Sequence, residues 1–266
     1  MMIKFICLAS GSSGNSYYIE YDEFGILIDA GISYRTIKKR FKENGLNIEN
    51  ICSVLITHDH ADHIRSVGYF GEELNIPIYT TKEIHSGINK NYCVSSKLYN
   101  SVKHIEKNQN FILGSFVIRA FEVPHDSTDC VGYNITCCGK TIVIATDLGK
   151  ITDTASVNIL QANYLILESN YDTDMLKSGR YSQQLKERVA GEKGHMSNED
   201  TALFLAKNYK ETIKHIWLCH LSNDNNTPEK ALQTTRIALE EKGIIIGKDV
   251  ELTVLKRNTP SLLYHL

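Results

Sequence analysis

The sequence predicts an α/β fold in which sheets lie inside and helices outside, and three observations support this. The first two thirds of the chain hold short β-rich runs, several of which end abruptly in Asp, His, Glu or Gly. The last third holds helical patterns between further strand-like runs. No repeat, low-complexity tract or flexible linker interrupts the 266 residues, of which 42% are hydrophobic. We therefore expect one layered domain over residues 1–266.

Eight runs in the first two thirds predict strands, because β-branched and aromatic residues are concentrated in them. A helix-like segment over 32–45 separates the third run from the fourth. Cys138-Gly139-Lys140 predicts the turn of a hairpin over 133–147. The eight runs occupy residues 3–9, 16–21, 25–31, 53–57, 116–123, 131–137, 141–147 and 164–169.

The last third carries two helix start signals. Ser197 opens a capping pattern before the apolar run that begins at Thr201, and Thr227-Pro228 starts a second helix that we expect to stop at Gly243. Strand patterns return over 213–220 and 250–255. Strands and helices therefore continue to alternate to the end of the chain.

The charge, the cysteine content and the apolar stretches of the sequence indicate which cellular compartment the protein occupies. The formal charge of −2 and the pI near 6.6 provide no global attraction to nucleic acid or to an anionic membrane, so contact with a polyanion needs a local patch. Seven cysteines without a C-x-x-C pair favour reduced thiols and a cytoplasmic protein. The N-terminal apolar run is too short for a signal peptide, and no later stretch has the length of a membrane span.

The stretch T-H-D-H-A-D-H, residues 57–63, directly follows a strand pattern and concentrates four potential metal ligands. On a regular helix His58, His60, Asp62 and His63 point in different directions, and a regular strand sends His63 to the opposite face. A tight turn from strand to helix lets one pair bind one ion and the other pair a neighbouring ion. Imidazole and carboxylate donors suit zinc, manganese or iron. Two divalent metal ions therefore fit the spacing better than one.

Other strand ends supply polar side chains that can complete two coordination shells. His125, Asp147 and His220 each follow an apolar run, and Asp29 does the same earlier in the chain. An aspartate between two cations is a suitable bridging ligand, because it offers one oxygen to each. Taken singly, the aspartates are also consistent with turns and His220 with a packed core histidine. Their shared position favours a common site.

These residues resemble the metallo-β-lactamase fold superfamily, whose H-x-H-x-D-H signature matches residues 58–63 and whose later ligands follow in the same order. The resemblance implies a four-layer αββα sandwich. It implies that His58, His60 and His125 bind one ion and that Asp62, His63 and His220 bind the other. Asp147 would bridge the ions, and Asp29 would orient a ligand imidazole.

Finer motifs resemble the YycJ-type hydrolases, also called WalJ or VicX. They are LASGSSGNSYYI, LESNYD, GHMSN and HLSNDNNTPE. The resemblance implies a cytoplasmic phosphodiesterase, with 5′-to-3′ exonuclease activity on DNA and an indirect link to a cell-wall two-component system. LESNYD departs from the commoner pattern, which has histidine where this chain has Tyr171. No role for Tyr171 follows from the resemblance.

The implied reaction is attack of a metal-bound hydroxide on phosphorus, with Asp62 orienting the nucleophile. We expect His195 to grip the phosphate and protonate the leaving oxygen; from chemistry alone it is equally consistent with a surface-loop histidine. Ser12 and Asn15 lie in a Gly-Ser loop that can present backbone N–H groups to an oxyanion, although such loops are usually only turns. Ser197 and Asn198 precede a helix, where they fit phosphate binding or a plain N-cap.

Segment 177–193 carries five basic and two acidic side chains, a local charge of +3 beside His195. Arg180 is our candidate there for contact with a nucleic-acid backbone, although such runs are often solvated helix faces.

Three other functions remain open at this level. A hydrolase of a small ester, thioester or lactam would use the same ions. A non-catalytic regulator of a two-component system usually loses metal ligands, whereas this chain keeps them. A di-iron oxidoreductase on this fold typically has glutamate where this chain has His60, and it usually carries a flavin domain.

Overall fold

The computed structural model describes residues 2–266 and divides the chain into two compact units. The first unit comprises the chain up to Ala120, Ser127–Cys130 and Lys256–Leu266. The second comprises Phe121–Asp126 and Val131–Leu255. The expectation of one domain over 1–266 stays a prediction.

The first unit is built around a seven-stranded sheet with the order β14-β1-β2-β3-β4-β5-β6. β1, β2 and β3 pair in antiparallel fashion, and β3 to β6 continue in parallel. Its strands are β1 (Lys4–Ala9), β2 (Ser16–Tyr21), β3 (Phe24–Ile28), β4 (Ile51–Leu55), β5 (Ile78–Thr80), β6 (Val102–His104) and β14 (Tyr264–His265).

Helices cover this sheet through apolar faces. Ile37 and Phe41 are the buried residues of α1 (Tyr34–Glu43), and the ring of Phe41 lies 4.6 Å from that of Tyr18 in β2. This burial explains why a helix with five basic side chains is stable here. The other helical segments of the unit are η1 (Ile48–Asn50), α2 (Ala61–Ile64), the π-helical turn η2 (Tyr69–Glu73) and α3 (Lys82–Lys90).

The second sheet has the order β13-β12-β11-β10-β9-β8-β7. β9 and β10 form an antiparallel hairpin, and β10 to β13 run in parallel. The strands are β7 (Asn110–Leu113), β8 (Phe116–Glu122), β9 (Val131–Cys137), β10 (Lys140–Ala145), β11 (Tyr164–Glu168), β12 (His215–Cys219) and β13 (Glu251–Val254).

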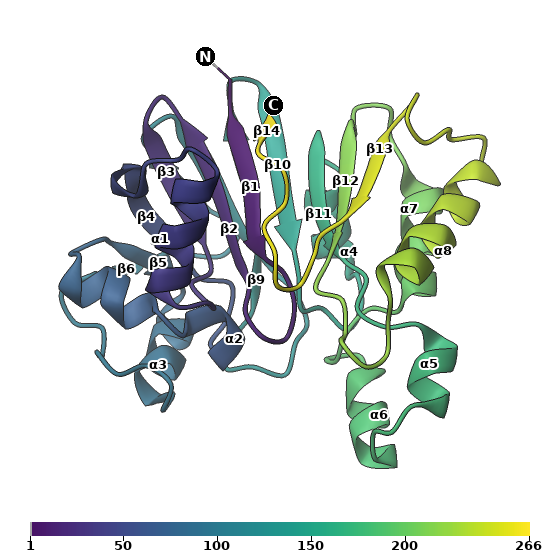
Figure 1. The fold of residues 1–266 in the computed structure, drawn as a ribbon, viewed down its shortest axis with the longest axis horizontal. Helices are drawn as coiled ribbons and strands as arrows, with labels where there is room; N and C mark the ends of the chain where they lie inside the picture. Colours follow the sequence, from purple (N-terminus) through teal and green to yellow (C-terminus); the bar gives the residue numbers. More distant parts are fainter. Residues whose placement is uncertain (1) are drawn as a thin grey trace. The chain divides into compact units, whose positions relative to one another are not determined.

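β11 and β12 are buried along nearly their whole length, as expected of parallel strands that are covered on both faces. Figure 1 shows α7 and α8 side by side next to β12 and β13. The helices of the second unit are α4 (Asp153–Ile159), α5 (Thr173–Ser178), α6 (Gln183–Val189), α7 (Asn198–Asn208) and α8 (Pro228–Glu240).

The backbone confirms the hairpin turn and the helix caps that the sequence predicts. Cys138 and Gly139 have φ of 51° and 73° at the hairpin turn, the conformation that a two-residue hairpin loop needs. Ser197 caps α7, Thr227 caps α8, and Gly243 follows α8 with φ of 79°. The α/β class with two sheets and flanking helices is likewise confirmed. Within residues 2–266, none of the helices has the length and apolar character of a bilayer span.

Candidate metal centre

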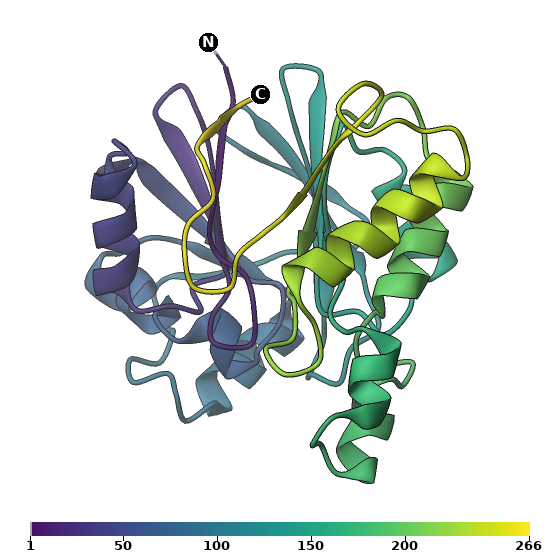
Figure 2. The same ribbon diagram turned by 45° about the vertical axis from the view of Figure 1, so that its right-hand side comes forward.

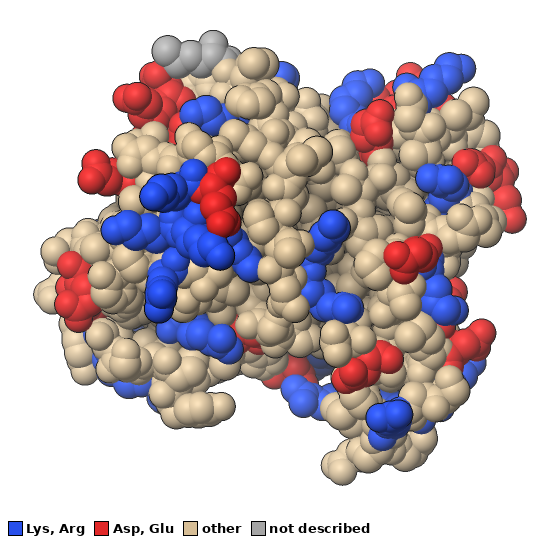
Figure 3. All heavy atoms as spheres, viewed as in Figure 1, with Lys and Arg blue, Asp and Glu red and all other residues tan. Residues whose placement is uncertain are grey.

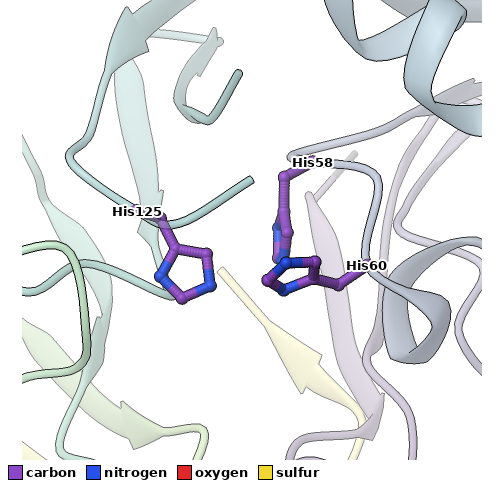
Figure 4. A group of neighbouring side chains, drawn as sticks. All are labelled: His58, His60 and His125. Atoms are coloured by element: carbon purple, nitrogen blue, oxygen red, sulfur yellow. The ribbon is translucent and has the colours of Figure 1, made fainter. Parts of the chain in front are cut away.

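The T-H-D-H-A-D-H stretch forms the predicted turn from strand to helix. β4 ends at Leu55, His60 is the N-cap residue of α2, and Asp62 and His63 lie in the single turn of that helix. The ring centroids of His58 and His60 are 4.7 Å apart, with the rings edge to face (Figure 4). Those of His58 and His63 are 4.0 Å apart. The turn therefore gathers three imidazoles that a regular helix or strand would separate.

Asp29 holds the imidazole of His63, as the resemblance implies. Asp29 Oδ2 lies 2.7 Å from His63 Nδ1, and Oδ1 accepts from the Thr57 backbone N–H at 2.9 Å. Because a carboxylate can only accept, Nδ1 of His63 carries the proton and its Nε2 keeps a lone pair. Both side chains are fully buried, so the ring cannot turn easily.

Asn15 lies against the same ligands and is completely buried. Its Nδ2 lies 2.9 Å from His63 Nε2 and 3.3 Å from Asp62 Oδ2, while its Oδ1 accepts from the backbone of Gly11. The amide thus packs behind the candidate ligands, and the structure gives it a positioning contact that the sequence did not predict.

Gly31 supports Asp62 through a very close backbone approach. A Cβ atom built on Gly31 would lie 1.6 Å from the carbonyl oxygen of Asp62. Asn15 bridges the same two segments, since its N–H donates to that oxygen at 2.8 Å and its own carbonyl accepts from the Gly31 N–H at 2.9 Å. Only glycine fits this position.

Three predicted site residues share an unusual backbone conformation. Asp29, Asp147 and His220 have φ of 59°, 55° and 55°, in the left-handed region that side chains other than glycine rarely adopt. Each one follows a buried strand, namely β3, β10 and β12. Such strain at three strand ends is typical of functional sites, where the fold forces side chains into place.

In the second unit, Asp147 lies between two candidate ligands that the resemblance assigns to different ions. Its Oδ1 is 3.8 Å from His125 Nε2 and 3.4 Å from His220 Nε2. His125, which follows β8 and is labelled in Figure 4, is held through Nδ1 by the carbonyl oxygen of Gly194 at 3.0 Å. A carboxylate oxygen close to both imidazoles fits the bridging role.

The donor set fits divalent ions. His63, His125 and His220 each have Nδ1 within 3.0 Å of a carboxylate or carbonyl oxygen, so Nε2 carries the lone pair that a metal would use; in His63 this nitrogen also faces the Asn15 amide at 2.9 Å. Nitrogen and carboxylate donors of this kind suit zinc, manganese or iron. The family resemblance and these clusters support divalent metal binding.

Glu168 is a functional residue that the sequence reasoning missed, although the LESNYD motif contains it. This fully buried side chain ends β11, and its Oε1 lies 2.8 Å from His195 Nδ1 and 3.0 Å from His220 Nδ1. Its Oε2 accepts from the backbone N–H groups of Leu148 and Met196. Burial alone raises the pKa of Glu168, but the charge and hydrogen bonds of the two histidines hold it below its usual value.

His195 lies in the same cluster of the second unit. One donor atom from each of Asp147, Glu168, His195 and His220 lies within 4.8 Å of the others. Burial lowers the pKa of His195, yet the Glu168 carboxylate outweighs it and the net shift is upward. The ring stacks on His220 at 5.3 Å and retains 21% exposure of its side chain, so it can reach a bound molecule.

The predicted substrate contacts have different environments. Ser12 and Arg180 are exposed. Ser197 caps α7, and Asn198 is fully buried with its N–H donating to the carbonyl of Tyr171. Asn198 Oδ1 also accepts from Ser169 and Asn226, so its polar groups hold neighbouring loops together.

Comparison with known proteins agrees with this geometry. Residues 25–220 match the model of a family described as "Beta-lactamase superfamily domain". "Exodeoxyribonuclease YycJ" of Bacillus anthracis is 34% identical over 264 residues, which cover 95% of each chain. "Exodeoxyribonuclease WalJ" of Streptococcus pneumoniae is 34% identical over 250 residues, covering 94% of this chain and 93% of the relative.

Among solved structures, the metallo-β-lactamase fold protein YhfI of Bacillus subtilis matches with a TM-score of 0.70 and 18% identity. The match covers 98% of this chain and 99% of YhfI. These similarities extend over nearly the whole sequence and confirm the predicted fold class. The chain belongs to the metallo-β-lactamase superfamily and, within it, to the YycJ/WalJ family.

Proposed function

We propose that this protein is a metal-dependent phosphodiesterase that acts as a DNA exonuclease with 5′-to-3′ direction. The observation that carries the proposal is the orientation of His63, His125 and His220, each with Nδ1 held by an oxygen acceptor. Identity of 34% with two proteins named exodeoxyribonucleases supports the same reaction class.

In this proposal His58, His60 and His125 hold one ion, and Asp62, His63 and His220 hold the other. Asp147 is shared between them, and Asp29 orients His63. When bound, two divalent ions lower the pKa of water and stabilise the negative oxygens of the phosphate. The proposal keeps zinc, manganese or iron as the candidate metals.

Asp62 and His195 have separate tasks. Asp62 accepts a hydrogen bond from the attacking water and so fixes its direction. His195 donates a proton from Nε2 to the leaving oxygen, because its Nδ1 faces the Glu168 carboxylate at 2.8 Å. The carboxylate also favours the protonated imidazole, which an acid needs.

Two basic surfaces support a nucleic-acid substrate. The 177–193 segment includes Arg180, which is exposed, whereas Arg188 in the same segment is paired with Asp126. Figure 3 shows Lys and Arg gathered over α1, whose sequence holds five basic side chains against Glu43 alone. Such patches bind phosphate backbones through charge. A cytoplasmic location and an indirect link to a two-component system belong to the proposal as well.

A substrate panel tests the reaction class. The protein loaded with zinc or manganese should hydrolyse bis-p-nitrophenyl phosphate and progressively shorten a 3′-labelled oligonucleotide, and His60→Ala should abolish both activities. Turnover of nitrocefin or a thioester without turnover of phosphodiesters would instead identify a small-ester or lactam hydrolase. Bound metal with no turnover in the whole panel would favour a regulator.

The leaving group tests His195. An alkoxide needs a proton on departure, whereas p-nitrophenolate does not. His195→Ala should therefore slow oligonucleotide cleavage by about 10²- to 10⁴-fold and change hydrolysis of bis-p-nitrophenyl phosphate far less. His265→Ala, which removes an exposed histidine on β14, is the matched control. Equal losses on both substrates would rule out the acid role.

A further inference from the structure

A small cavity lies between α5 and α6 in the second unit. Its volume is about 270 Å³, which is below the size of most drug-binding sites and suits one small ring system. Figure 2 shows these two helices side by side and apart from α7 and α8. The cavity is lined on one side by Tyr171, Leu176 and Lys177 and on the other by Gln183, Lys186 and Ala190.

The face of α6 that lines this cavity is largely open to solvent, since Gln183 and Ala190 are exposed and Lys186 is half-buried. Gln183, Lys186 and Ala190 are spaced at i, i+3 and i+7 and so share one side of the helix. No residue of α6 is buried, although a seven-residue helix is not stable in water without packing. A molecule in the cavity would add packing to this open face of α6.

The lining has the chemistry of a nucleotide site. Tyr171 and Leu176 are 6% and 4% exposed and offer apolar surface to a planar ring. Burial raises the pKa of Tyr171 to about 12, so the phenol stays neutral. Lys177 and Lys186 add two positive charges beside these apolar walls, against the single negative charge of Glu187, and Lys186 Nζ donates to the Lys177 carbonyl at 2.6 Å. Apolar surface for a ring next to charge for a phosphate is the combination that proteins use to bind single-stranded nucleic acid.

Backbone contacts connect the cavity to the candidate acid. The N–H of His195 donates to the carbonyl of Val189, the last residue of α6, at 2.8 Å. Tyr171 forms a β-bridge with Ser197, two residues beyond His195. A molecule that packs against α6 and Tyr171 therefore contacts two elements that are paired through the backbone with His195 and with Ser197.

We infer that this cavity binds the base of a nucleotide next to the bond that is cut, in a single-stranded DNA substrate. The inference rests on the proposed phosphodiesterase function and specifies how its substrate is held. A base enters only when it is unstacked, so the site favours single strands over duplexes.

Filling the cavity tests the inference. Gln183→Phe places a large ring in the lining, and Gln184→Phe is the matched control, because Gln184 is the next residue of α6 and does not line the cavity. Gln183→Phe should lower kcat/KM for a single-stranded oligonucleotide by about 10- to 100-fold, the size of one lost base stack.

An oligonucleotide with an abasic site at the terminal nucleotide identifies the base as the ligand. The wild type should lose about the same factor on this substrate, and Gln183→Phe should cause no further loss. The inference is overturned if the variant slows cleavage of abasic and normal substrates equally, or if Gln184→Phe has the same effect. A wild type without activity on any phosphodiester would refute the proposed function. Binding of the oligonucleotide, measured by fluorescence anisotropy, then tests the role of the cavity independently of turnover. Weaker binding by Gln183→Phe but not by Gln184→Phe would support the inference, and unchanged binding by Gln183→Phe would overturn it.

Discussion

Replacement of Glu168 by glutamine removes the group that joins the histidines of the second unit. Glu168 Oε1 accepts from His195 and His220, and Oε2 accepts from two backbone N–H groups. A glutamine amide has one acceptor oxygen and one NH₂ group. Whichever way the amide turns, the NH₂ group faces two donors, so two hydrogen bonds are lost in a fully buried place.

The magnitude follows from those two bonds. Hydrogen bonds to a charged group contribute about 1.5 to 3 kcal/mol each, so Glu168→Gln should lower the free energy of unfolding by about 3 to 6 kcal/mol. In a chain of this length that corresponds to a fall in Tm of about 6 to 24 °C. The imidazoles also lose their orientation, and metal affinity should fall about 10- to 100-fold.

Two measurements separate these effects. Thermal unfolding in EDTA reports the loss of hydrogen bonds without metal, and zinc titration reports the loss of imidazole orientation. Glu168→Asp is the control that keeps the charge and shortens the side chain by one methylene. If Glu168→Gln unfolds at the wild-type temperature in EDTA and binds zinc as tightly, the assigned contacts of Glu168 do not hold this cluster.

Three further predictions concern other parts of the structure. Gly31→Ala places a Cβ against the Asp62 carbonyl and should lower the free energy of unfolding by about 2 to 4 kcal/mol, measured by urea denaturation; an unchanged midpoint would contradict the close approach. Asp29→Asn should weaken zinc binding about 10- to 100-fold, because His63 loses its charged acceptor, while wild-type affinity would exclude that role. Burial lowers the pKa of His215 to about 4, so the folded state favours the neutral imidazole. The neutral imidazole therefore contributes fully to the stability of the fold above pH 6.5, and this contribution is lost as the pH falls towards 4. After allowance for the partial exposure of His215, the wild type should lose about 1 kcal/mol more than His215→Phe between pH 7 and 5 in urea titrations, and parallel pH profiles would refute this.

Much of the site was predictable because it is encoded locally. An apolar run followed by Asp or His marks a strand end, and the spacing of His58 to His63 excludes a regular helix or strand at that point. The structure places these residues in the predicted turn. The caps at Ser197 and Thr227 were also predictable, because a cap depends on only a few neighbouring residues.

Contacts between distant segments were not predictable in this way. In the sequence, Glu168 is only the polar residue at the end of a further strand. Its hydrogen-bond partners His195 and His220 lie 27 and 52 residues further along the chain. In the sequence, Asn15 belongs to a Gly-Ser turn. In the structure its amide contacts His63, which lies 48 residues further along the chain.

The sequence by itself determined which chemical groups this protein has and at which strand ends they occur. The tertiary structure decided which of them meet, because β11 lies between β10 and β12 and brings Glu168 to His220. It also decided their direction, since Asp29, Asp147 and His220 adopt a left-handed backbone that only a few per cent of non-glycine residues take up. The packing of the surrounding sheets offsets the cost of that conformation, and such packing exists only in the folded chain.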